Sequence, residues 1–297
     1  MRFGVLGTGF WAREIHAASI AEHEDAELVG VWGRNLAKAK ALGAQFDVQG
    51  YDDVDALLAE VDAVSFSLPP DVQVPLAIRA AEAGKHLLLE KPIALTVEDA
   101  DRLVSAVRDN GVASVVFFTF RFQQATATWL AQAARTKLAG GAGSWLGNNY
   151  QPDSPFKDST WRKEQGALWD IGPHALSLFI PALGPVTRVQ TGAGFGDTVH
   201  LILTHESGAA STVSLSHTVA PMSSGVEFFV HGDAGRITLL PEAGPAARAA
   251  HQVAVTELTQ AATTGGTHPC DVGFGREVVA VLAAAQRALE VGCVETV

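Results

Sequence analysis

The chain has 297 residues, about twice a common domain length of roughly 150 residues, so two domains are the first expectation. Hydrophobic residues make up 47% and charged residues 18%, which is enough apolar material for a buried core and excludes an intrinsically disordered chain. The 21 Lys and Arg against 32 Asp and Glu give a formal net charge of -11, which disfavours general attraction to nucleic acid or to anionic membranes.

The cysteines and the N-terminal residues indicate where in the cell the protein is expected. Cys270 and Cys293 lack any Cys-x-x-Cys or Cys/His ligand spacing, so we expect neither a disulfide framework nor a metal site. The N-terminus enters an apolar strand pattern at Phe3 without the features of a signal peptide, and no apolar stretch approaches about 18 residues. We therefore expect a cytoplasmic protein without a membrane span.

Short apolar runs alternate with segments of helical periodicity in the first part of the chain. The expected strands are Phe3–Leu6, Leu28–Trp32, Ala63–Phe66, His86–Leu89 and Val115–Phe118. The expected helices are Trp11–Ala21, Leu36–Leu42, Val72–Ala83 and Thr96–Arg108. This alternation predicts βαβ units in a doubly wound, parallel α/β domain over residues 1–120.

The pattern changes after Phe120. A helix is expected at Gln123–Leu138, followed by a break of small residues at Ala139–Gly143, a strand at Trp145–Tyr150 and a second helix at Pro173–Leu183. The later expected strands are Val186–Thr191, Val199–His205, Ala210–His217, Val226–His231 and Arg236–Leu240. Strands that follow strands predict an antiparallel sheet, so residues 121–297 are expected to form an α+β domain, with a last helix at about residues 272–289.

A glycine-rich turn follows the first strand. It reads Gly7-Thr8-Gly9-Phe10-Trp11-Ala12, a Gly-x-Gly-x-x-Ala pattern. Gly7 permits the tight turn, Gly9 lets the backbone approach a pyrophosphate, and Ala12 allows close packing of the helix. The helix N-terminus supplies N–H groups and partial positive charge for phosphates. The pattern predicts a dinucleotide site; the alternative is a turn in an α/β fold that binds another ligand or none.

The residues after the second strand bear on which dinucleotide binds. An NAD site usually has a carboxylate here for the ribose hydroxyls, but this chain reads Gly33-Arg34-Asn35. Arg34 has the charge and planar shape to pair with a 2′-phosphate. The sequence therefore favours NADP over NAD, unless Arg34 is simply solvated and Asn35 only caps the next helix.

A charged pair ends the strand that begins at His86. Pro92 follows Glu90 and Lys91 and biases Lys91 away from helical geometry, so Lys91 is expected to be extended at the carboxyl end of a parallel strand. Ligands of open α/β sheets bind at that edge. Lys91 is therefore a candidate site residue; the alternative is a solvated surface lysine.

A third motif reads Asp170-Ile171-Gly172-Pro173-His174. Pro173 suits the first turn of a helix, so Asp170 and His174 are expected near its beginning, on one face. A histidine and a carboxylate arranged in this way can relay a proton. The alternative is that Asp170 is a helix N-cap and His174 a hydrogen-bonded structural residue.

The three motifs in this order resemble the Gfo/Idh/MocA oxidoreductase family, named for glucose–fructose oxidoreductase, inositol dehydrogenase and a rhizopine-catabolism protein. The resemblance covers nearly the whole chain and includes Trp161-Arg162 and His268-Pro269. It implies an N-terminal Rossmann domain and a C-terminal domain whose open antiparallel sheet often forms a homodimer interface. It also implies tightly held NAD or NADP and a sugar, polyol or related hydroxyl compound as substrate.

The resemblance further implies residue roles. Lys91 would bind the reacting hydroxyl and help to move its proton, Asp170 would support substrate binding, and His174 would be the principal acid/base. The substrate-side candidates are Lys91, Arg121, Phe156, Trp161, Asp170 and His174. The cofactor-side candidates are Gly7, Thr8, Gly9, Phe10, Trp11, Gly33, Arg34, Asn35, Ser67, Leu68, Pro69, Gln73, Glu90, Lys91, Trp161 and Arg162.

Two positions depart from the family pattern. Gln73 stands where a histidine is common, which we expect to change contacts on the cofactor side rather than the chemistry. One glycine of a common pair before Asp170 is missing, because the chain reads Gln165-Gly166-Ala167 there. The backbone near Asp170 is therefore less well defined by the resemblance.

The leading hypothesis is reversible hydride transfer between nicotinamide and a sugar-like or polyol substrate, with proton movement through His174 and Lys91. One alternative is a catalytically idle NADP-binding protein that senses redox state or regulates a partner. Another is a reductase of a C=C, imine or trans-dihydrodiol-type substrate on the same scaffold. We expect a small-molecule substrate, a homodimer through the C-terminal sheet, and neither nucleic acid nor a membrane as partner.

Overall fold

The chain divides into two compact units. The computed structural model describes residues 1–152, 154–239 and 246–297. The first unit consists of Met1–Phe122 and Gly244–Glu277, and the second of Gln123–Ala243 and Val278–Val297. The chain passes from the first unit to the second after Phe122 and returns to the first unit with the segment up to Glu277.

The first unit is built on a six-stranded parallel sheet in the order β3-β2-β1-β4-β5-β6. Its strands are β1 (Arg2–Leu6), β2 (Glu27–Trp32), β3 (Gln49–Tyr51), β4 (Ala63–Phe66), β5 (His86–Glu90) and β6 (Ser114–Phe117). Every residue of β4 and β6 is buried, as expected for strands covered on both faces. The predicted Rossmann fold is confirmed. The sequence did not reveal β3, because three residues are too few for a recognisable strand pattern.

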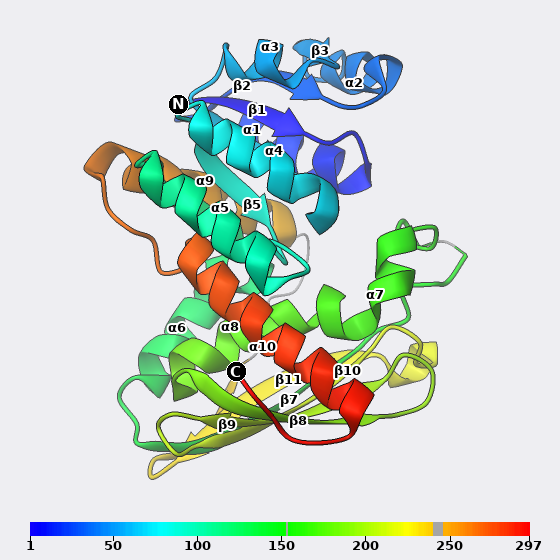
Figure 1. Ribbon diagram of the computed structural model, residues 1–297, viewed down its shortest axis with the longest axis vertical. Coiled ribbons are helices and arrows are strands. Elements are labelled where there is room, and N and C mark those ends of the chain that lie inside the picture. Colours follow the sequence, from blue (N-terminus) through cyan, green and yellow to red (C-terminus); the bar gives the residue numbers. More distant parts are fainter. Residues whose placement is uncertain (153, 240–245) are drawn as a thin grey trace. The chain divides into compact units, whose positions relative to one another are not determined.

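The helices of the first unit cover both faces of this sheet. They are η1 (Ala12–Ala17), α1 (Ala18–Ala21), α2 (Leu36–Gly43), α3 (Val54–Leu58), α4 (Pro70–Glu82), α5 (Val97–Asp109), η2 (Thr119–Phe122) and α9 (Ala246–Thr264). Figure 1 shows α4 and α5 packed together in front of the strands, with α9 behind. The predicted start of α5 is confirmed, since the Thr96 side chain accepts a hydrogen bond from the Asp99 N–H.

Helix α9 explains why the chain returns to the first unit. Ala250, Ala254 and Leu258 recur every four residues and are buried, which gives the helix one apolar face. This helix contacts η1, α1, β5 and β6. The segment belongs to the first unit because its apolar face completes the cover of that sheet, an arrangement that no local pattern in the sequence indicates.

The second unit contains a seven-stranded sheet in the order β12-β11-β7-β10-β9-β8-β13. Its strands are β7 (Leu138–Leu146), β8 (Val186–Ala193), β9 (Val199–His205), β10 (Ala210–Ser216), β11 (Gly225–Gly232), β12 (Gly235–Leu239) and β13 (Glu295–Thr296). The β7–β10 pair is parallel and the other pairs are antiparallel, so the predicted open, mainly antiparallel sheet is confirmed. Leu240, the expected end of the β12 strand, lies outside the described residues.

Among the described residues of the second unit there are four helices and one short 3₁₀ turn. They are α6 (Gln124–Ala133), α7 (Thr160–Asp170), α8 (Gly172–Leu183), η3 (Pro221–Ser223) and the later part of α10 (Val272–Val291). Helix α8 packs on β7 and β10. The opposite sheet face carries exposed residues of β9 such as His200 and Ile202, so this face is open.

The expected helix over Gln123–Leu138 is too long at its C-terminal end, and the expected break at Ala139–Gly143 is wrong. The helix stops at Ala133, and the small residues belong to β7, which lies between β10 and β11. A Cβ atom on Gly143 would lie 2.3 Å from the Phe228 ring, and one on Gly140 would lie 2.4 Å from the Ala210 carbonyl oxygen. These glycines therefore allow close packing within a strand rather than breaking it.

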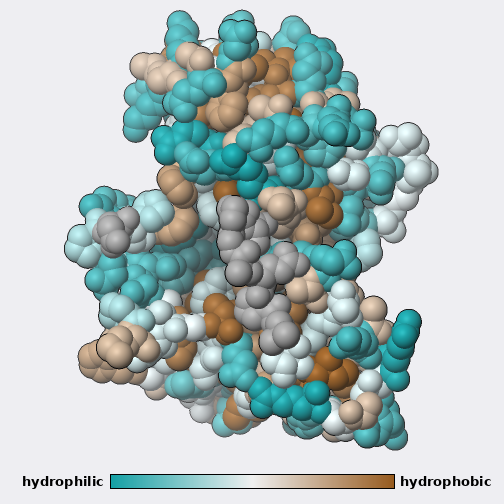
Figure 2. All heavy atoms as spheres, turned by 180° about the vertical axis from the view of Figure 1, so that it is seen from behind, coloured by the Kyte–Doolittle hydropathy of each residue, from teal (hydrophilic) through white to brown (hydrophobic). Residues whose placement is uncertain are grey.

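Hydrophilic and hydrophobic side chains are mixed on the molecular surface. On the face drawn in Figure 2, teal and white residues dominate and brown residues form small groups. Among the helices in the described part of the chain, none has the length and apolar character needed to cross a membrane.

Candidate active site

The glycine-rich turn lies between the ends of β1 and β4. Gly7 has φ +135°, and a Cβ atom there would lie 2.4 Å from the Ser67 carbonyl oxygen, so only glycine fits. Its N–H donates to the Trp32 carbonyl at 2.9 Å. A Cβ atom on Gly9 would meet nothing within 4 Å, which leaves open space beside the backbone at the start of the helix. The turn thus fits a phosphate-bearing dinucleotide.

The end of β2 lies against this turn. A Cβ atom on Gly33 would lie 2.5 Å from the Thr8 Cγ2 atom, so Gly33 lets the two loops approach each other. Arg34 is exposed. Asn35 is the N-cap of α2, because its Oδ1 accepts from the Lys38 N–H at 3.1 Å. The capping role considered for Asn35 is therefore present, and Arg34 stays available to a ligand.

The first helix differs from the continuous α-helix expected over Trp11–Ala21. Residues Ala12–Ala17 form a π-helix, and the residues on either side of it, Phe10, Trp11 and Ala18–Ala21, are α-helical. A π-turn holds one residue more than an α-turn and changes which side chains face the sheet. Phe10 is 42% exposed at the start of this helix, whereas the Trp11 indole N–H donates to Glu90 Oε1 at 2.7 Å.

Glu90 and Lys91 lie at the carboxyl end of β5. The Lys91 N–H donates to Glu90 Oε2 at 3.2 Å. Gln73 in α4 is fully buried: its side-chain amide donates to the Glu90 carbonyl, and its oxygen accepts from the Glu90 N–H, both at 2.9 Å. Gln73 therefore holds the backbone of the Glu-Lys-Pro segment, a role that the sequence did not reveal.

The first unit brings most of its predicted site residues to one sheet edge. Gly7, Gly33, Ser67 and Lys91 follow the carboxyl ends of β1, β2, β4 and β5 respectively. Leu68 and Pro69 continue from Ser67 and are partly exposed. Arg121 follows β6, and its guanidinium carbon lies 5.8 Å from the centre of the Phe274 ring. Ligands bind at this edge in open α/β sheets.

Asp170 is the buried carboxylate of the second unit. It is 4% exposed and ends α7, where its Oδ2 accepts from Arg162 Nε at 3.0 Å. The Nε2 atom of His217 lies 2.9 Å from the same oxygen. His217 was not among the predicted site residues; its only signal in the sequence is a histidine at the end of a predicted strand.

The hydrogen bonds around His217 define how it faces Asp170. Asn149 Nδ2 donates to His217 Nδ1 at 2.9 Å, so the ring proton lies on Nε2, the nitrogen close to the Asp170 carboxylate. The Tyr150 ring meets the His217 ring edge-on, with centroids 5.9 Å apart. Burial and then the negative charges of Asp197 and Asp170 raise the pKa of Tyr150. The Tyr150 hydroxyl therefore stays a hydrogen-bond donor, and it donates to the Arg162 carbonyl at 3.1 Å.

Asp170 and His174 both lie at the start of α8, as expected, but Asp170 precedes the helix and so does not share a helix face with His174. α7 ends at Asp170 and α8 begins at Gly172, since Pro173 has no N–H to continue the earlier helix. His174 lies in the first turn of α8 and stacks on Trp145, with ring centroids 5.1 Å apart. Gly166, the retained glycine of the motif, has φ +66° and kinks α7.

Further predicted residues gather around the Arg162 guanidinium. Its central carbon lies 4.6 Å from the centre of the Phe156 ring and 5.0 Å from the Trp161 ring. Such cation–π contacts hold a guanidinium in place. The second unit therefore brings Phe156, Trp161 and Arg162 together with Asp170.

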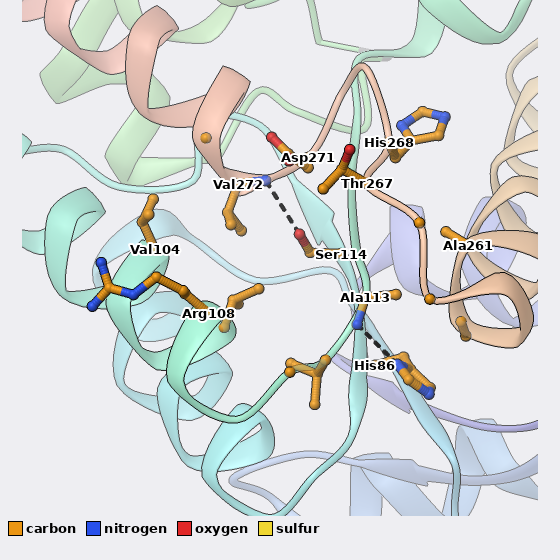
Figure 3. Close-up of a pocket in the computed structure, with 17 residues that line it drawn as sticks. His86, Val104, Arg108, Ala113, Ser114, Ala261, Thr267, His268, Asp271 and Val272 are labelled. Atoms are coloured by element: carbon orange, nitrogen blue, oxygen red, sulfur yellow. Dashed lines mark hydrogen bonds between the residues drawn. The ribbon is translucent and has the colours of Figure 1, made fainter.

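A cavity of about 390 Å³ lies elsewhere in the first unit. Figure 3 shows His86 and Ser114 in its wall, with the Ala113 N–H donating to His86 Nδ1 and the Val272 N–H donating to Ser114 Oγ. His86 begins β5 and Ser114 begins β6, so this cavity lies at the amino ends of the strands, opposite the edge of the glycine-rich turn. It does not belong to the candidate active site.

Comparisons with known proteins match both halves of the chain. Residues 1–118 match the oxidoreductase family with an NAD-binding Rossmann fold, and residues 140–238 match the GFO/IDH/MocA C-terminal domain. A dTDP-3,4-didehydro-2,6-dideoxy-alpha-D-glucose 3-reductase of Streptomyces antibioticus is 29% identical over 252 residues, 80% of this chain and 75% of that protein. Matched segments span only 32%, 51% and 34% of three other curated relatives.

Solved structures agree on the fold. An oxidoreductase from Agrobacterium radiobacter, solved in complex with NAD+, L-tartaric acid and magnesium, has a TM-score of 0.84 at 20% identity. The similarity covers 100% of this chain and 98% of that chain. With both domain types matched in order, the chain belongs to the Gfo/Idh/MocA oxidoreductase family, and its first unit is an NAD-binding Rossmann fold.

Proposed function

We propose that the protein is an NAD(P)-dependent oxidoreductase that acts on a sugar, a polyol or a related hydroxyl or carbonyl compound. The observation that carries the proposal is the sheet edge of the first unit, where the glycine-rich turn and Lys91 follow the carboxyl ends of β1 and β5. That edge is where such sheets bind dinucleotides. The family membership and the sugar reductase among the relatives support the same substrate class.

The residues of the turn fit the dinucleotide. Gly9 leaves open space for a pyrophosphate, and the helix that starts beside it offers N–H groups and partial positive charge. When bound there, the nicotinamide accepts or supplies the hydride. The protein supplies binding, orientation and proton movement.

The proposed proton chemistry uses Lys91 and His174. Lys91 binds the reacting hydroxyl through its ammonium group and lowers the free energy of the alkoxide-like charge that develops there. His174 lies in the first turn of α8, and the positive end of the helix favours its neutral form, which can accept a proton. Asp170, held by Arg162, binds substrate hydroxyls in this scheme.

Turnover on a panel of compounds tests this proposal. Purified protein with NADP or NAD is mixed with sugars and polyols, and the absorbance of reduced nicotinamide is followed. We expect turnover on members of the panel, and His174→Asn should lower it by about 10²-fold, because a general base is lost, with cofactor affinity nearly unchanged. Equal turnover in the variant contradicts the role of His174.

Two other functions remain as alternatives to this proposal. Tight binding of NADP without turnover on any compound supports a redox sensor or regulator instead. Turnover only on C=C, imine or dihydrodiol compounds supports a reductase of that type on the same scaffold. Mass spectrometry of the nicotinamide that copurifies with the protein identifies the cofactor directly.

We further propose a homodimer through the open face of the second sheet. Ile202 on β9 is 47% exposed on that face, and the family resemblance implies dimerisation there. Ile202→Glu should shift the mass measured by light scattering from two chains toward one, because a charge would be buried at the interface. An unchanged mass contradicts this interface.

A further inference from the structure

A cluster of polar side chains lies buried behind the Glu-Lys-Pro segment. Its members are Ser19 on α1, Ser65 on β4, His16 in the π-helix and His251 on α9, and all four are fully buried. His16 Nε2 lies 3.1 Å from Glu90 Oε1, and its Nδ1 lies 2.8 Å from Ser65 Oγ. His251 Nε2 lies 3.3 Å from Ser65 Oγ, and its Nδ1 lies 2.6 Å from Ser19 Oγ.

The donors and acceptors in this cluster form one ordered chain. The Glu90 carboxylate only accepts hydrogen bonds, so His16 Nε2 carries a proton, and His16 Nδ1 is within hydrogen-bond distance of the Ser65 hydroxyl. His251 Nε2 also lies 3.2 Å from His16 Nδ1, and the Ser19 hydroxyl donates to the His16 carbonyl at 3.1 Å. Every ring nitrogen of the two histidines therefore has a partner within the cluster.

The surroundings of His251 favour its neutral ring. Burial, and then the proximity of His16, lower the pKa of His251 well below its usual value. The two rings have centroids 4.3 Å apart, so two positive charges would repel each other at this fully buried site. The contacts therefore connect Ser19 to the Glu90 carboxylate through His251, Ser65 and His16.

We propose that His16 and His251 are positioning residues: the chain Ser19–His251–Ser65–His16 ends on Glu90 and holds the backbone that carries Lys91. Glu90 is the point where these contacts converge, because its Oε1 also accepts from Trp11 and its Oε2 accepts from the Lys91 N–H. The π-helix supplies this geometry, since it turns His16 toward the sheet between Ser65 and Glu90. This inference rests on the proposed role of Lys91 in catalysis.

The alternative is a purely structural cluster that only ties α9 to the sheet. A second contact between the same elements distinguishes the positioning role from this structural role. His23 Nε2 bonds to Thr256 Oγ1 at 2.8 Å, which also ties the end of α1 to α9 but has no connection to Glu90. Loss of His23 or of His251 removes a contact with α9, whereas only loss of His251 interrupts the hydrogen bonds that lead to Glu90.

The experiment compares His251→Leu, His251→Gln and the control His23→Leu in the full-length protein. For each variant, kcat and KM are measured with a compound that the wild-type protein turns over, and the affinities for NADH and NADPH by fluorescence. His251→Leu should lower kcat by about tenfold with cofactor affinity within about twofold, because Lys91 is displaced but the dinucleotide edge is kept. His251→Gln should restore much of kcat, since its amide donates to Ser65, and His23→Leu should leave kcat unchanged.

A spectroscopic measurement tests the chain without activity. Nitrogen-15 spectra of the histidine rings should show a proton on His16 Nε2 and a neutral His251 ring in the wild-type protein. Ser19→Ala, a small change chosen in case His251→Leu does not fold, should alter the His251 signals and leave those of His23 unchanged.

The outcomes separate this inference from the proposed function. An unchanged kcat in a folded His251→Leu protein, or a His16 ring without a proton on Nε2, overturns the positioning role. If the wild-type protein turns over no compound but His16 shows the Nε2 proton and His251 is neutral, the hydrogen-bonded chain stands and the proposed function fails.

Discussion

At the scale of single residues, Arg34 decides the cofactor preference that we propose. It is exposed after β2, and the N-cap of α2 is supplied by the neighbouring Asn35, so its guanidinium remains available to a 2′-phosphate. Arg34→Ala should weaken NADP binding by about tenfold or more and NAD binding much less, because only NADP carries that charge. Fluorescence titration with both reduced cofactors measures the two affinities. Similar losses for both would mean that Arg34 does not read the 2′-phosphate.

His217 is the second position where one residue carries a prediction. It is fully buried beside Asp170, so its loss leaves a buried carboxylate with one partner fewer. His217→Leu should lower the free energy of unfolding by about 1–3 kcal/mol and raise the KM for substrate, because Asp170 shifts. Urea denaturation and steady-state kinetics measure both quantities.

The control for this variant is another histidine of the second unit. His200 on β9 is exposed and bonds to Ser214 Oγ at 2.9 Å. At a protein concentration at which light scattering gives the mass of one chain, His200→Leu should change the unfolding free energy by no more than about 0.5 kcal/mol, because it is then a surface position. Equal effects of the two substitutions would contradict the role of His217 in holding Asp170.

Residue-level prediction from sequence was successful where the chemistry is local. The glycine-rich turn, Lys91 after a parallel strand and the Thr96 cap depend on neighbours within a few residues, and the structure has them at the predicted ends of elements. His217 was not recognisable in this way, and Gln73 was expected only as a contact on the cofactor side, not as support for the Glu90 backbone. Their roles depend on Asp170 and Glu90, which are far from them in the sequence.

At the scale of elements, β7 depends on its glycines. A Cβ atom at Gly140 would lie 2.4 Å from a backbone oxygen of β10, and a backbone atom cannot move aside as a flexible side chain can. Gly140→Ala should therefore lower the free energy of unfolding by about 2 kcal/mol or more, by overpacking.

Gly192 in β8 is the matched control, because a Cβ atom there would meet nothing within 4 Å. Gly192→Ala should be nearly neutral or slightly stabilising, since alanine restricts the unfolded chain. Both free energies come from urea denaturation. A Gly140→Ala protein as stable as the Gly192→Ala protein would contradict the packing explanation.

At the scale of the whole molecule, buried histidines make stability depend on pH. Burial lowers the pKa of His251 well below 6.5 and also lowers those of His86 and His205. Below pH 6.5 the unfolded chain binds protons that the folded protein does not, so the stability should fall as the pH decreases through that value.

The size of the effect is testable for His251. Its contribution to the slope is at most about 1.4 kcal/mol per pH unit. His251→Gln removes this titration, so the stability of the variant should fall less between about pH 7 and about pH 5 than that of the wild-type protein. Urea denaturation at several pH values measures the slopes. Parallel slopes would show that His251 is protonated in the folded protein.

The sequence by itself determined the Rossmann fold, the edge of its sheet that faces a dinucleotide, the mainly antiparallel second sheet and the main site motifs. Each of these follows from local periodicity, turn chemistry and spacing within a short segment. Only the tertiary structure decided that α9 returns to the first unit, that the small residues after α6 form β7, and that His217 holds Asp170 and His251 reaches Glu90 through His16. The physical reason is that these features depend on contacts between side chains far apart in the chain, and burial and hydrogen-bond partners exist only once the sheets have formed.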